Sequence, residues 1–150
     1  MLFNREIATP ELFRELMPLL EKHYEEIAHH KDVPLDPDWQ QYEKLEQINA
    51  LRVFTARDAD GRLVGYAVYF VRHNIHYRSS LQALQDILFI DPAVRGFGAK
   101  FILWCDKQLA AEGVHITYHH VKAAHNFGPM LERLGYNLVD LIFTKRLESK

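Results

Sequence analysis

The feature that most constrains this chain is a strand, a glycine-containing turn and a helix in direct succession. The segment SLQALQDILFI (80–90) is strand-like, and its end is almost wholly apolar, as in a strand buried on both faces. The turn DPAVRGFGAK (91–100) holds two of the chain's seven glycines. A helical pattern then runs from Gly98 to Glu112, and Gly113 ends it. Such a unit places the amino-terminal end of a helix directly after a sheet strand.

The turn has the chemistry of an anion site. The first turn of a helix carries unpaired N–H groups and a positive partial charge. Gly96 and Gly98 let a ligand approach the backbone closely, while Arg95 and Lys100 add positive charge, a combination that suits a diphosphate. An ordinary tight turn is the alternative, since short glycine motifs often arise by chance. The turn matches neither a P-loop, which needs Gly-Lys-Ser/Thr, nor a dinucleotide fingerprint, whose third glycine is missing here.

The remaining pattern predicts a mixed α/β fold in one domain, residues 1–150. A first helix is capped by Thr9–Pro10 and should be kinked or split by Pro18, and a second runs from Asp36–Pro37 to about Asn49. Asp60–Gly61 predicts a hairpin. The other expected elements are strands at 51–58, 62–73 and 114–123, a short helix from Pro129 to Leu134, and one or two strands within 136–147.

Composition excludes several classes of protein. Of the 150 residues, 48% are hydrophobic and 25% charged, with a net charge of −2, which gives no reason to expect nucleic acid or an anionic membrane as partner. The longest uncharged apolar stretch, Leu63–Val71, is too short for a membrane span, and the amino terminus lacks an apolar signal core. The single cysteine, Cys105, allows no internal disulfide and shares the apolar face of its helix, so we expect it in the core of a cytoplasmic protein rather than as a nucleophile.

Nine histidines raise the question of a metal site. The closest pairs are His29–His30, His73 with His76, and His119–His120. Odd spacings on strands point side chains to opposite faces of a sheet, and the first pair has no carboxylate or cysteine at ligand spacing. We therefore expect no metal.

The order of elements resembles the GNAT superfamily of acyltransferases. The resemblance rests on two initial helices, a hairpin, a strand ending in LFIDPAVRGFGAKFI, a further strand, and a short helix ending in LERLGY, and it covers nearly the whole chain. Residues 85–113 are similar to that family's acetyl-CoA motif, Gln/Arg-x-x-Gly-x-Gly/Ala. A frame that begins at Arg95 ends on Lys100, and one that begins at Ala93 has both glycines but the wrong first residue. The resemblance implies an N-acetyltransferase with a central mixed sheet that uses acetyl-CoA as acyl donor.

The resemblance also implies a binding site for the acyl donor. Backbone N–H groups of the turn would hold the CoA pyrophosphate, from Val94, Arg95, Gly96, Phe97, Gly98, Ala99 and Lys100. The backbone of Leu88, Phe89 and Ile90 would pair with the pantetheine arm like an extra strand. That pairing requires the strand to splay from its neighbour at 114–123, leaving a slot for the thioester. Asn126 matches a position that contacts the cofactor arm in many members.

Acyl transfer to an amine needs a base for the amine, a donor for the oxyanion and an acid for the thiolate. Asp86 is the candidate catalytic base, because burial in its apolar strand would raise its pKa; a structural carboxylate is the alternative. A backbone N–H near Phe89 or Ile90 would stabilise the oxyanion. Leu131 stands where many members have the tyrosine that serves as the acid.

The acceptor side is less constrained. The first helices border the acceptor pocket in this superfamily, so Glu25 and Glu26 would bind a cationic amine, unless they form an ordinary solvated helix end. His119, His120 or His125 would line the same side. The acceptor stays open between a small polyamine, an aminoglycoside, an amino acid and a protein lysine, and a homodimer is possible because edge strands commonly pair in this fold. Leu131 and the imperfect glycine pattern keep a second hypothesis, a non-catalytic acyl-CoA-binding or regulatory module.

Overall fold

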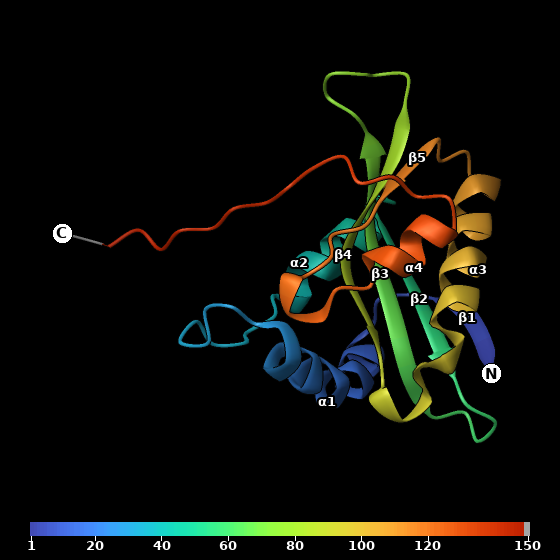
Figure 1. Ribbon diagram of the computed structural model, residues 1–150. Coiled ribbons are helices and arrows are strands. Elements are labelled where there is room, and N and C mark those ends of the chain that lie inside the picture. Colours follow the sequence, from blue (N-terminus) through green and yellow to red (C-terminus); the bar gives the residue numbers. More distant parts are fainter. Residues whose placement is uncertain (149–150) are drawn as a thin grey trace.

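A five-stranded sheet in the order β1-β2-β3-β4-β5 forms the centre of the structure, a computed structural model that describes residues 1–148 (Figure 1). The strands are β1 (Leu2–Glu6), β2 (Leu51–Arg57), β3 (Leu63–His73), β4 (Leu81–Ile90) and β5 (Ile116–Tyr118). The first four pair antiparallel in succession, and β5 joins β4 in parallel. The expected mixed α/β sheet is therefore confirmed.

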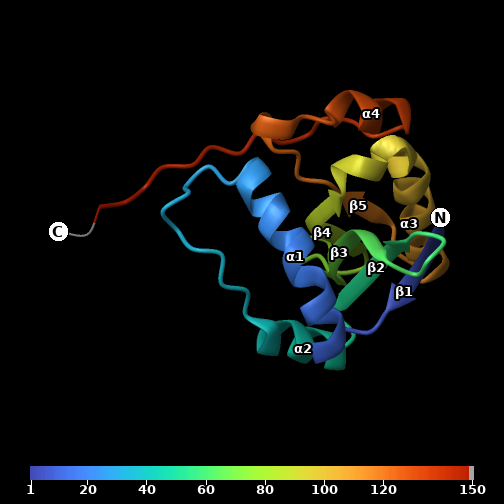
Figure 2. The ribbon, with the colours of Figure 1, turned by 90° about the horizontal axis from the view of Figure 1, so that it is seen from below.

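Helices cover both faces of this sheet, α1 and α2 on one side and α3 and α4 on the other (Figure 2). The helices are α1 (Pro10–Ile27), α2 (Trp39–Gln47), α3 (Gly98–Ala111) and α4 (Gly128–Arg133), with short 3-10 helices η1 (Pro92–Phe97) and η2 (Ala123–His125). None of the helices within residues 1–148 has the length and apolar character that a membrane span requires.

The alternation of side chains along β3 divides the core into two layers. Tyr66 and Val68 belong to the cluster under α1, whereas Ala67 and Tyr69 belong to the cluster that α3 covers. Cys105 of α3 is fully buried in the second cluster, as expected. Burial of apolar surface on both faces holds the helices against the sheet.

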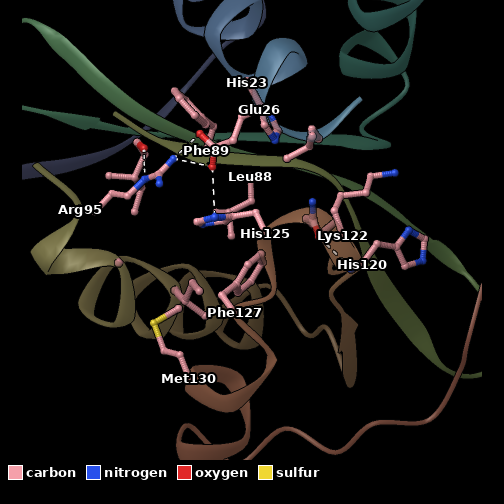
Figure 3. A pocket seen from close by; sticks show the side chains of 15 residues that line it. His23, Glu26, Leu88, Phe89, Arg95, His120, Lys122, His125, Phe127 and Met130 are labelled. Atoms are coloured by element: carbon pink, nitrogen blue, oxygen red, sulfur yellow. Dashed lines mark hydrogen bonds and ion pairs between the residues drawn. The ribbon is translucent and has the colours of Figure 1, made fainter. Parts of the chain in front are cut away.

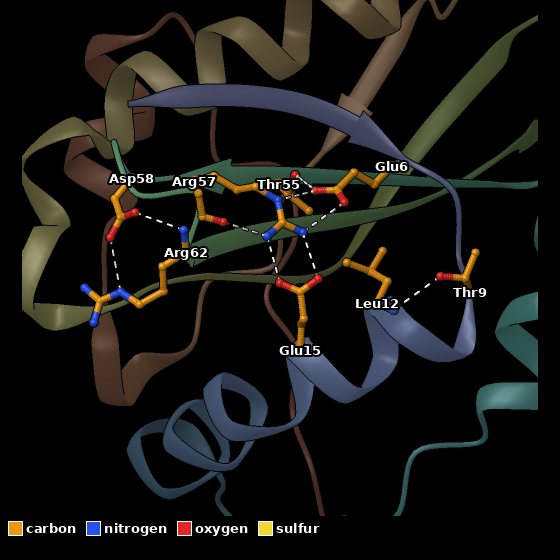
Figure 4. Close-up of polar contacts among 9 residues, drawn as sticks. Glu6, Thr9, Leu12, Glu15, Thr55, Arg57, Asp58 and Arg62 are labelled. Carbon is orange, nitrogen blue, oxygen red and sulfur yellow. Dashed lines mark hydrogen bonds and ion pairs between the residues drawn. The ribbon is translucent and has the colours of Figure 1, made fainter.

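The first helix starts as expected but is not split. The Thr9 side chain accepts a hydrogen bond from the Leu12 N–H, and Pro10 follows in the first turn (Figure 4). Pro18 lies inside one continuous helix, so the expectation of a split is wrong. Leu16 and Leu19 are buried on either side of the proline and hold both turns on the sheet, which offsets the missing backbone hydrogen bond.

The second helix begins later than expected. Its cap is Asp38, whose side chain accepts from the Gln41 N–H at 3.0 Å, and the helix runs only from Trp39 to Gln47. Asp36–Pro37 carries the same local signal two residues earlier, so two competing caps stand in one short stretch.

The sequence does not predict strand β1, because its segment, LFNRE, has no strong alternation. It pairs antiparallel with β2, and Glu6 also binds side chains on its neighbour. Arg57 donates to Glu6 at 3.0 Å and to Glu15 of α1 at 2.7 Å, and Thr55 donates its hydroxyl to Glu6 (Figure 4). The edge strand is therefore held by an ion-pair network that links it to α1.

The predicted hairpin between β2 and β3 is confirmed. Gly61 has φ +79°, a backbone conformation that favours glycine. Asp58 closes the turn by accepting from the Asp60 N–H. It also accepts from the Arg62 N–H (Figure 4).

The largest differences from the sequence expectation lie after α3. The strand expected at 114–123 shortens to β5, and the carboxyl-terminal tail, residues 136–148, contains no helix or strand. This tail projects away from the rest of the chain (Figure 1). A strand needs a neighbour for its backbone hydrogen bonds, and within residues 1–148 the tail pairs with none.

Candidate functional site

Strand β4 loses its second neighbour halfway along its length. It pairs with β5 at Gln82↔Ile116, Ala83↔Thr117 and Leu84↔Tyr118, where the pairing ends. Residues 87–90 pair with β3 alone, and the chain after Tyr118 leaves the sheet. The expected splay between the two strands is therefore confirmed, and it leaves one backbone edge of β4 open.

A β-bulge marks the place where β4 changes. Val68 stands opposite Ile87 and Tyr69 opposite Gln85, so Asp86 is the extra residue of the bulge. Tyr42 of α2 donates its hydroxyl to Asp86 Oδ2 at 2.5 Å. Burial raises the pKa of Asp86, and the hydrogen bond from Tyr42 offsets part of that rise. The pKa of Asp86 is therefore raised, as expected, and its carboxylate faces α2.

A cavity of about 230 Å³ lies along the open edge of β4 (Figure 3). It is walled by the end of α1, the second half of β4, the start of α3 and residues 120–130. The predicted site residues that line it are Glu26, Leu88, Phe89, Ile90, Arg95, Gly98, His120 and His125. Those that do not line it are Glu25, Asp86, Val94, Gly96, Phe97, Ala99, Lys100, His119 and Asn126.

Glu26 joins two basic side chains across this cavity (Figure 3). Arg95 donates to both carboxylate oxygens of Glu26 at 2.5 and 2.7 Å, and His125 Nδ1 lies 3.2 Å from one of them. Arg95 Nε also donates to the Ile90 carbonyl at 3.1 Å, and its guanidinium lies 5.7 Å from the centre of the Phe89 ring. A cavity wall is therefore tied together by one arginine that bridges α1 and β4.

His23 is a buried histidine of the cavity that the sequence analysis did not single out. Its Nδ1 lies 2.9 Å from the Tyr66 hydroxyl oxygen, and its ring stacks on Phe89. Burial lowers the pKa of His23 to about 4, so the ring is neutral at pH 7. His23 follows Leu20 by three residues, so it continues the buried face of α1. This helical spacing is the sequence signal that indicates its burial.

The turn between β4 and α3 is partly closed by its own hydrogen bonds. The Val94 N–H donates to the Asp91 carbonyl at 2.9 Å, and the Gly98 N–H donates to the Arg95 carbonyl. Of the amides from Val94 to Lys100 that are expected to hold the pyrophosphate, these two therefore already have partners within the turn. The 3-10 turn η1 consumes them locally.

Gly96 and the beginning of α3 keep the features of an anion cradle. A Cβ on Gly96 would meet no atom within 4 Å, and its φ is not positive, so neither packing nor backbone conformation requires glycine there. Phe97, the cap residue of α3, provides no side-chain acceptor for the first-turn amides. The positive end of α3 thus stands beside a backbone segment that a ligand can approach closely.

Other predicted residues have local partners. Asn126 Oδ1 accepts from the Gly128 N–H at 2.9 Å at the start of α4. His119 packs edge-on against Tyr69 and Tyr136, and burial lowers its pKa to about 4. Leu131 is 6% exposed and belongs to the core. Within residues 1–148, no group of three His, Cys, Asp or Glu side chains is arranged to hold a metal ion.

A second cavity, of about 340 Å³, lies between α1, α2 and the loop that joins them. Its lining is mostly aromatic and aliphatic, and it includes Tyr42 and Ile87, the neighbours of Asp86 in contact and in sequence. Asp86 therefore lies next to this cavity, in contact with Tyr42 and followed by Ile87, while Leu88, Phe89 and Ile90 line the first cavity.

Comparison with solved structures identifies the fold. An aminoglycoside acetyltransferase from an uncultured soil metagenomic sample is 18% identical with a TM-score of 0.73, and the match covers 98% of this chain and 96% of that chain. The ribosomal-protein-alanine N-acetyltransferase of Brucella melitensis biovar Abortus 2308 is 17% identical with a TM-score of 0.70, over 98% and 100%. The glucosamine-6-phosphate N-acetyltransferase of Arabidopsis thaliana is 11% identical with a TM-score of 0.70, over 99% and 100%.

No protein-family model and no curated protein sequence matches the chain, so the likeness is one of structure. The matches extend over nearly the full length of each protein. The chain has the fold of the GNAT N-acetyltransferases.

Proposed function

We propose that this protein is an N-acetyltransferase that transfers the acetyl group of acetyl-CoA to a primary amine of a small molecule or a protein. The observation that carries the proposal is the open edge of β4 beside a cavity. An extended chain with amide groups binds a free strand edge through main-chain hydrogen bonds. The pantetheine arm has this form, and the backbone of Leu88, Phe89 and Ile90 would receive it.

The turn and the start of α3 would receive the pyrophosphate. Gly96 allows the ligand to approach the backbone closely, and the first-turn amides of α3 and the side chain of Lys100 supply positive charge. Arg95 lies in the turn between β4 and α3. Because Arg95 donates to the Ile90 carbonyl here, binding of the arm at that carbonyl requires Arg95 to share or leave it.

Asp86 would accept the proton of the attacking amine. Its raised pKa makes it a better proton acceptor than an exposed aspartate, and Tyr42 orients the carboxylate. Glu26 already pairs with Arg95 and lies against His125, so a cationic acceptor would compete with these two side chains for it. Tyr42, which contacts Asp86, also lines the second cavity, and the lining of that cavity is mostly apolar. This favours an acceptor whose amine is attached to an apolar group.

One observation favours the alternative, a non-catalytic acyl-CoA-binding or regulatory module. Leu131, at the position of the usual tyrosine acid, is buried in the core, and Tyr136 donates its hydroxyl to Asp106 at 2.6 Å. A thiolate leaving from this site would then depart without a tyrosine donor from α4. Binding and turnover therefore have to be measured separately.

Calorimetry with acetyl-CoA tests the binding, and release of free CoA thiol with a panel of amines tests the turnover. We expect micromolar binding, and a loss of turnover of about 100-fold or more in Asp86→Asn, which keeps an acceptor for Tyr42. Glu132→Gln, an exposed carboxylate on α4, is the matched control and leaves turnover unchanged. Absence of binding at high micromolar acetyl-CoA contradicts the proposal, whereas binding with no turnover on any amine favours the module.

A further inference from the structure

Glu26 is the only carboxylate in the lining of the cavity beside β4, among residues 1–148 (Figure 3). It comes from the last turn of α1, and its side chain is 24% exposed. The basic side chains of the same lining are Arg95, Lys122, His23, His120 and His125. An anion that enters this cavity meets mostly basic groups, and Glu26 alone opposes it. A carboxylate at this place therefore weakens the attraction of the cavity for an anion.

The side chain of Arg95 turns away from the segment that carries it. Its backbone belongs to η1, the turn before α3, but its guanidinium points back to α1 and β4 (Figure 3). There it donates to both carboxylate oxygens of Glu26 at 2.5 and 2.7 Å and, through Nε, to the Ile90 carbonyl at 3.1 Å. Within residues 1–148 these are all the hydrogen bonds of the guanidinium. The charge of Arg95 is therefore paired with Glu26 at the open edge of β4.

A diphosphate is a stronger partner for a guanidinium than a single carboxylate is. Arginine binds phosphate oxygens in the same paired geometry as carboxylate oxygens, and a diphosphate offers more negative charge and more oxygens. The side chains of the Glu26–Arg95 pair are 24% and 34% exposed, so water limits the strength of the pair. Because the Arg95 backbone already lies in the turn proposed for the pyrophosphate, rotation of its side chain brings the guanidinium to that group.

We propose that Glu26 and the pyrophosphate of the acyl donor compete for Arg95, and that donor binding moves the guanidinium from Glu26 to the pyrophosphate. The inference rests on the proposed function and adds to it a positioning residue that acts on the donor through Arg95. Departure of Arg95 also frees the Ile90 carbonyl, which the pantetheine arm requires. Of its two contacts, Glu26 then keeps the one to His125, at 3.2 Å. Glu26 thus lowers the affinity for the donor by holding Arg95 beside β4.

Calorimetry with acetyl-CoA on Glu26→Gln tests the competition. The amide keeps an oxygen that accepts from Arg95 but removes the charge that holds it, so the dissociation constant of acetyl-CoA is expected to fall about three- to tenfold. Glu21→Gln, which replaces an exposed carboxylate of the same helix, removes the same charge and is expected to leave the dissociation constant unchanged. If the pair were only a structural tie between α1 and η1, Glu26→Gln would weaken binding or leave it unchanged, and would not tighten it.

A double-mutant cycle shows whether Glu26 acts through Arg95. Arg95→Ala is expected to weaken the binding of acetyl-CoA about tenfold. Adding Glu26→Gln to Arg95→Ala is expected to change the dissociation constant no further, because no guanidinium is left to release. A gain of affinity from Glu26→Gln in both backgrounds means that Glu26 repels the donor directly, and it overturns the competition. Thermal unfolding without acetyl-CoA checks that each variant is folded.

The outcomes separate this inference from the proposed function. Equal dissociation constants for the wild type and Glu26→Gln leave the donor site in place and overturn the role of Glu26. Failure of both proteins to bind acetyl-CoA contradicts the proposed function and, with it, the competition. Tighter binding in Glu26→Gln that disappears when Arg95 is also replaced supports both.

Discussion

The two halves of β4 belong to one strand but differ at their second edge. Residues 82–84 lie between β3 and β5, whereas residues 88–90 have β3 on one side and a cavity on the other. Ala83 in the first half is fully buried, and Leu88 in the second is half-buried and lines the cavity. The last pair with β5 is at Leu84, and the bulge at Asp86 lies two residues further along, where the open edge begins.

Introducing a carboxylate into each half of β4 produces the largest expected difference in stability. Ala83→Asp buries a carboxylate without a partner and is expected to lower the free energy of unfolding by about 3–5 kcal/mol, which chemical denaturation measures. Leu88→Asp places its carboxylate at the cavity, so the loss of stability is smaller, while binding of acetyl-CoA is abolished. Equal losses of stability in the two variants would mean that the second half is as closed as the first.

Two buried histidines give the next contrast, one beside each half. His23 lines the cavity and His119 follows β5, and burial lowers the pKa of each to about 4 from an ordinary 6.5. The unfolded chain gains a proton on each histidine below pH 6.5 and the folded chain does not, so stability falls as pH drops from 6.5 to about 4.

Each histidine contributes on the order of 3 kcal/mol to that loss. Replacing one by glutamine removes its share of the pH dependence, and urea unfolding at several pH values between 4 and 7 measures it. If His23→Gln leaves the slope of the wild type, His23 takes up its proton at about the same pH in the folded and the unfolded chain, and the cavity is wetter than its geometry indicates.

Local signals account for what the sequence predicted well. The Thr9 cap, the Asp60–Gly61 turn and Gly113, with φ +90°, act over a few residues, so the elements they bound are found as expected. The strand before the glycine turn and the helix after it are likewise predicted from patterns within a few residues, and the structure contains both, as β4 and α3. The separation of β4 from its neighbour came from the resemblance alone, because no local pattern encodes a gap between two strands.

Long-range contacts account for what the sequence could not predict. Arg95 meets Glu26 and Asp86 meets Tyr42 across 69 and 44 positions of the chain, and no spacing rule connects such residues. β1 forms because β2 offers an edge, although the LFNRE segment has little pattern of its own. The tail illustrates the reverse case, in which a good strand pattern has no partner strand within residues 1–148.

Two glycines provide a third, smaller contrast. A Cβ on Gly65 would come within 3.1 Å of the Phe89 carbonyl oxygen, whereas one on Gly96 meets nothing within 4 Å. Gly65→Ala is therefore expected to cost about 1–3 kcal/mol of stability, measured by thermal unfolding. Gly96→Ala leaves stability within about 0.5 kcal/mol but weakens acetyl-CoA binding about tenfold by calorimetry, because the methyl group fills the cradle. Unchanged affinity in Gly96→Ala would separate Gly96 from the pyrophosphate.

The smallest expected effect tests the bulge itself. The hydroxyl of Tyr42 lowers the pKa of Asp86, against the larger effect of burial, so Tyr42→Phe raises that pKa further. A base must be deprotonated to act, so the rise of turnover with pH moves to higher pH, and turnover below the midpoint falls about two- to tenfold. Tyr77→Phe, which removes an exposed hydroxyl from the β3–β4 loop, leaves the profile in place. A profile that stays unmoved in Tyr42→Phe while Asp86→Asn abolishes turnover would mean that Asp86 acts through its position in the bulge and not through its proton.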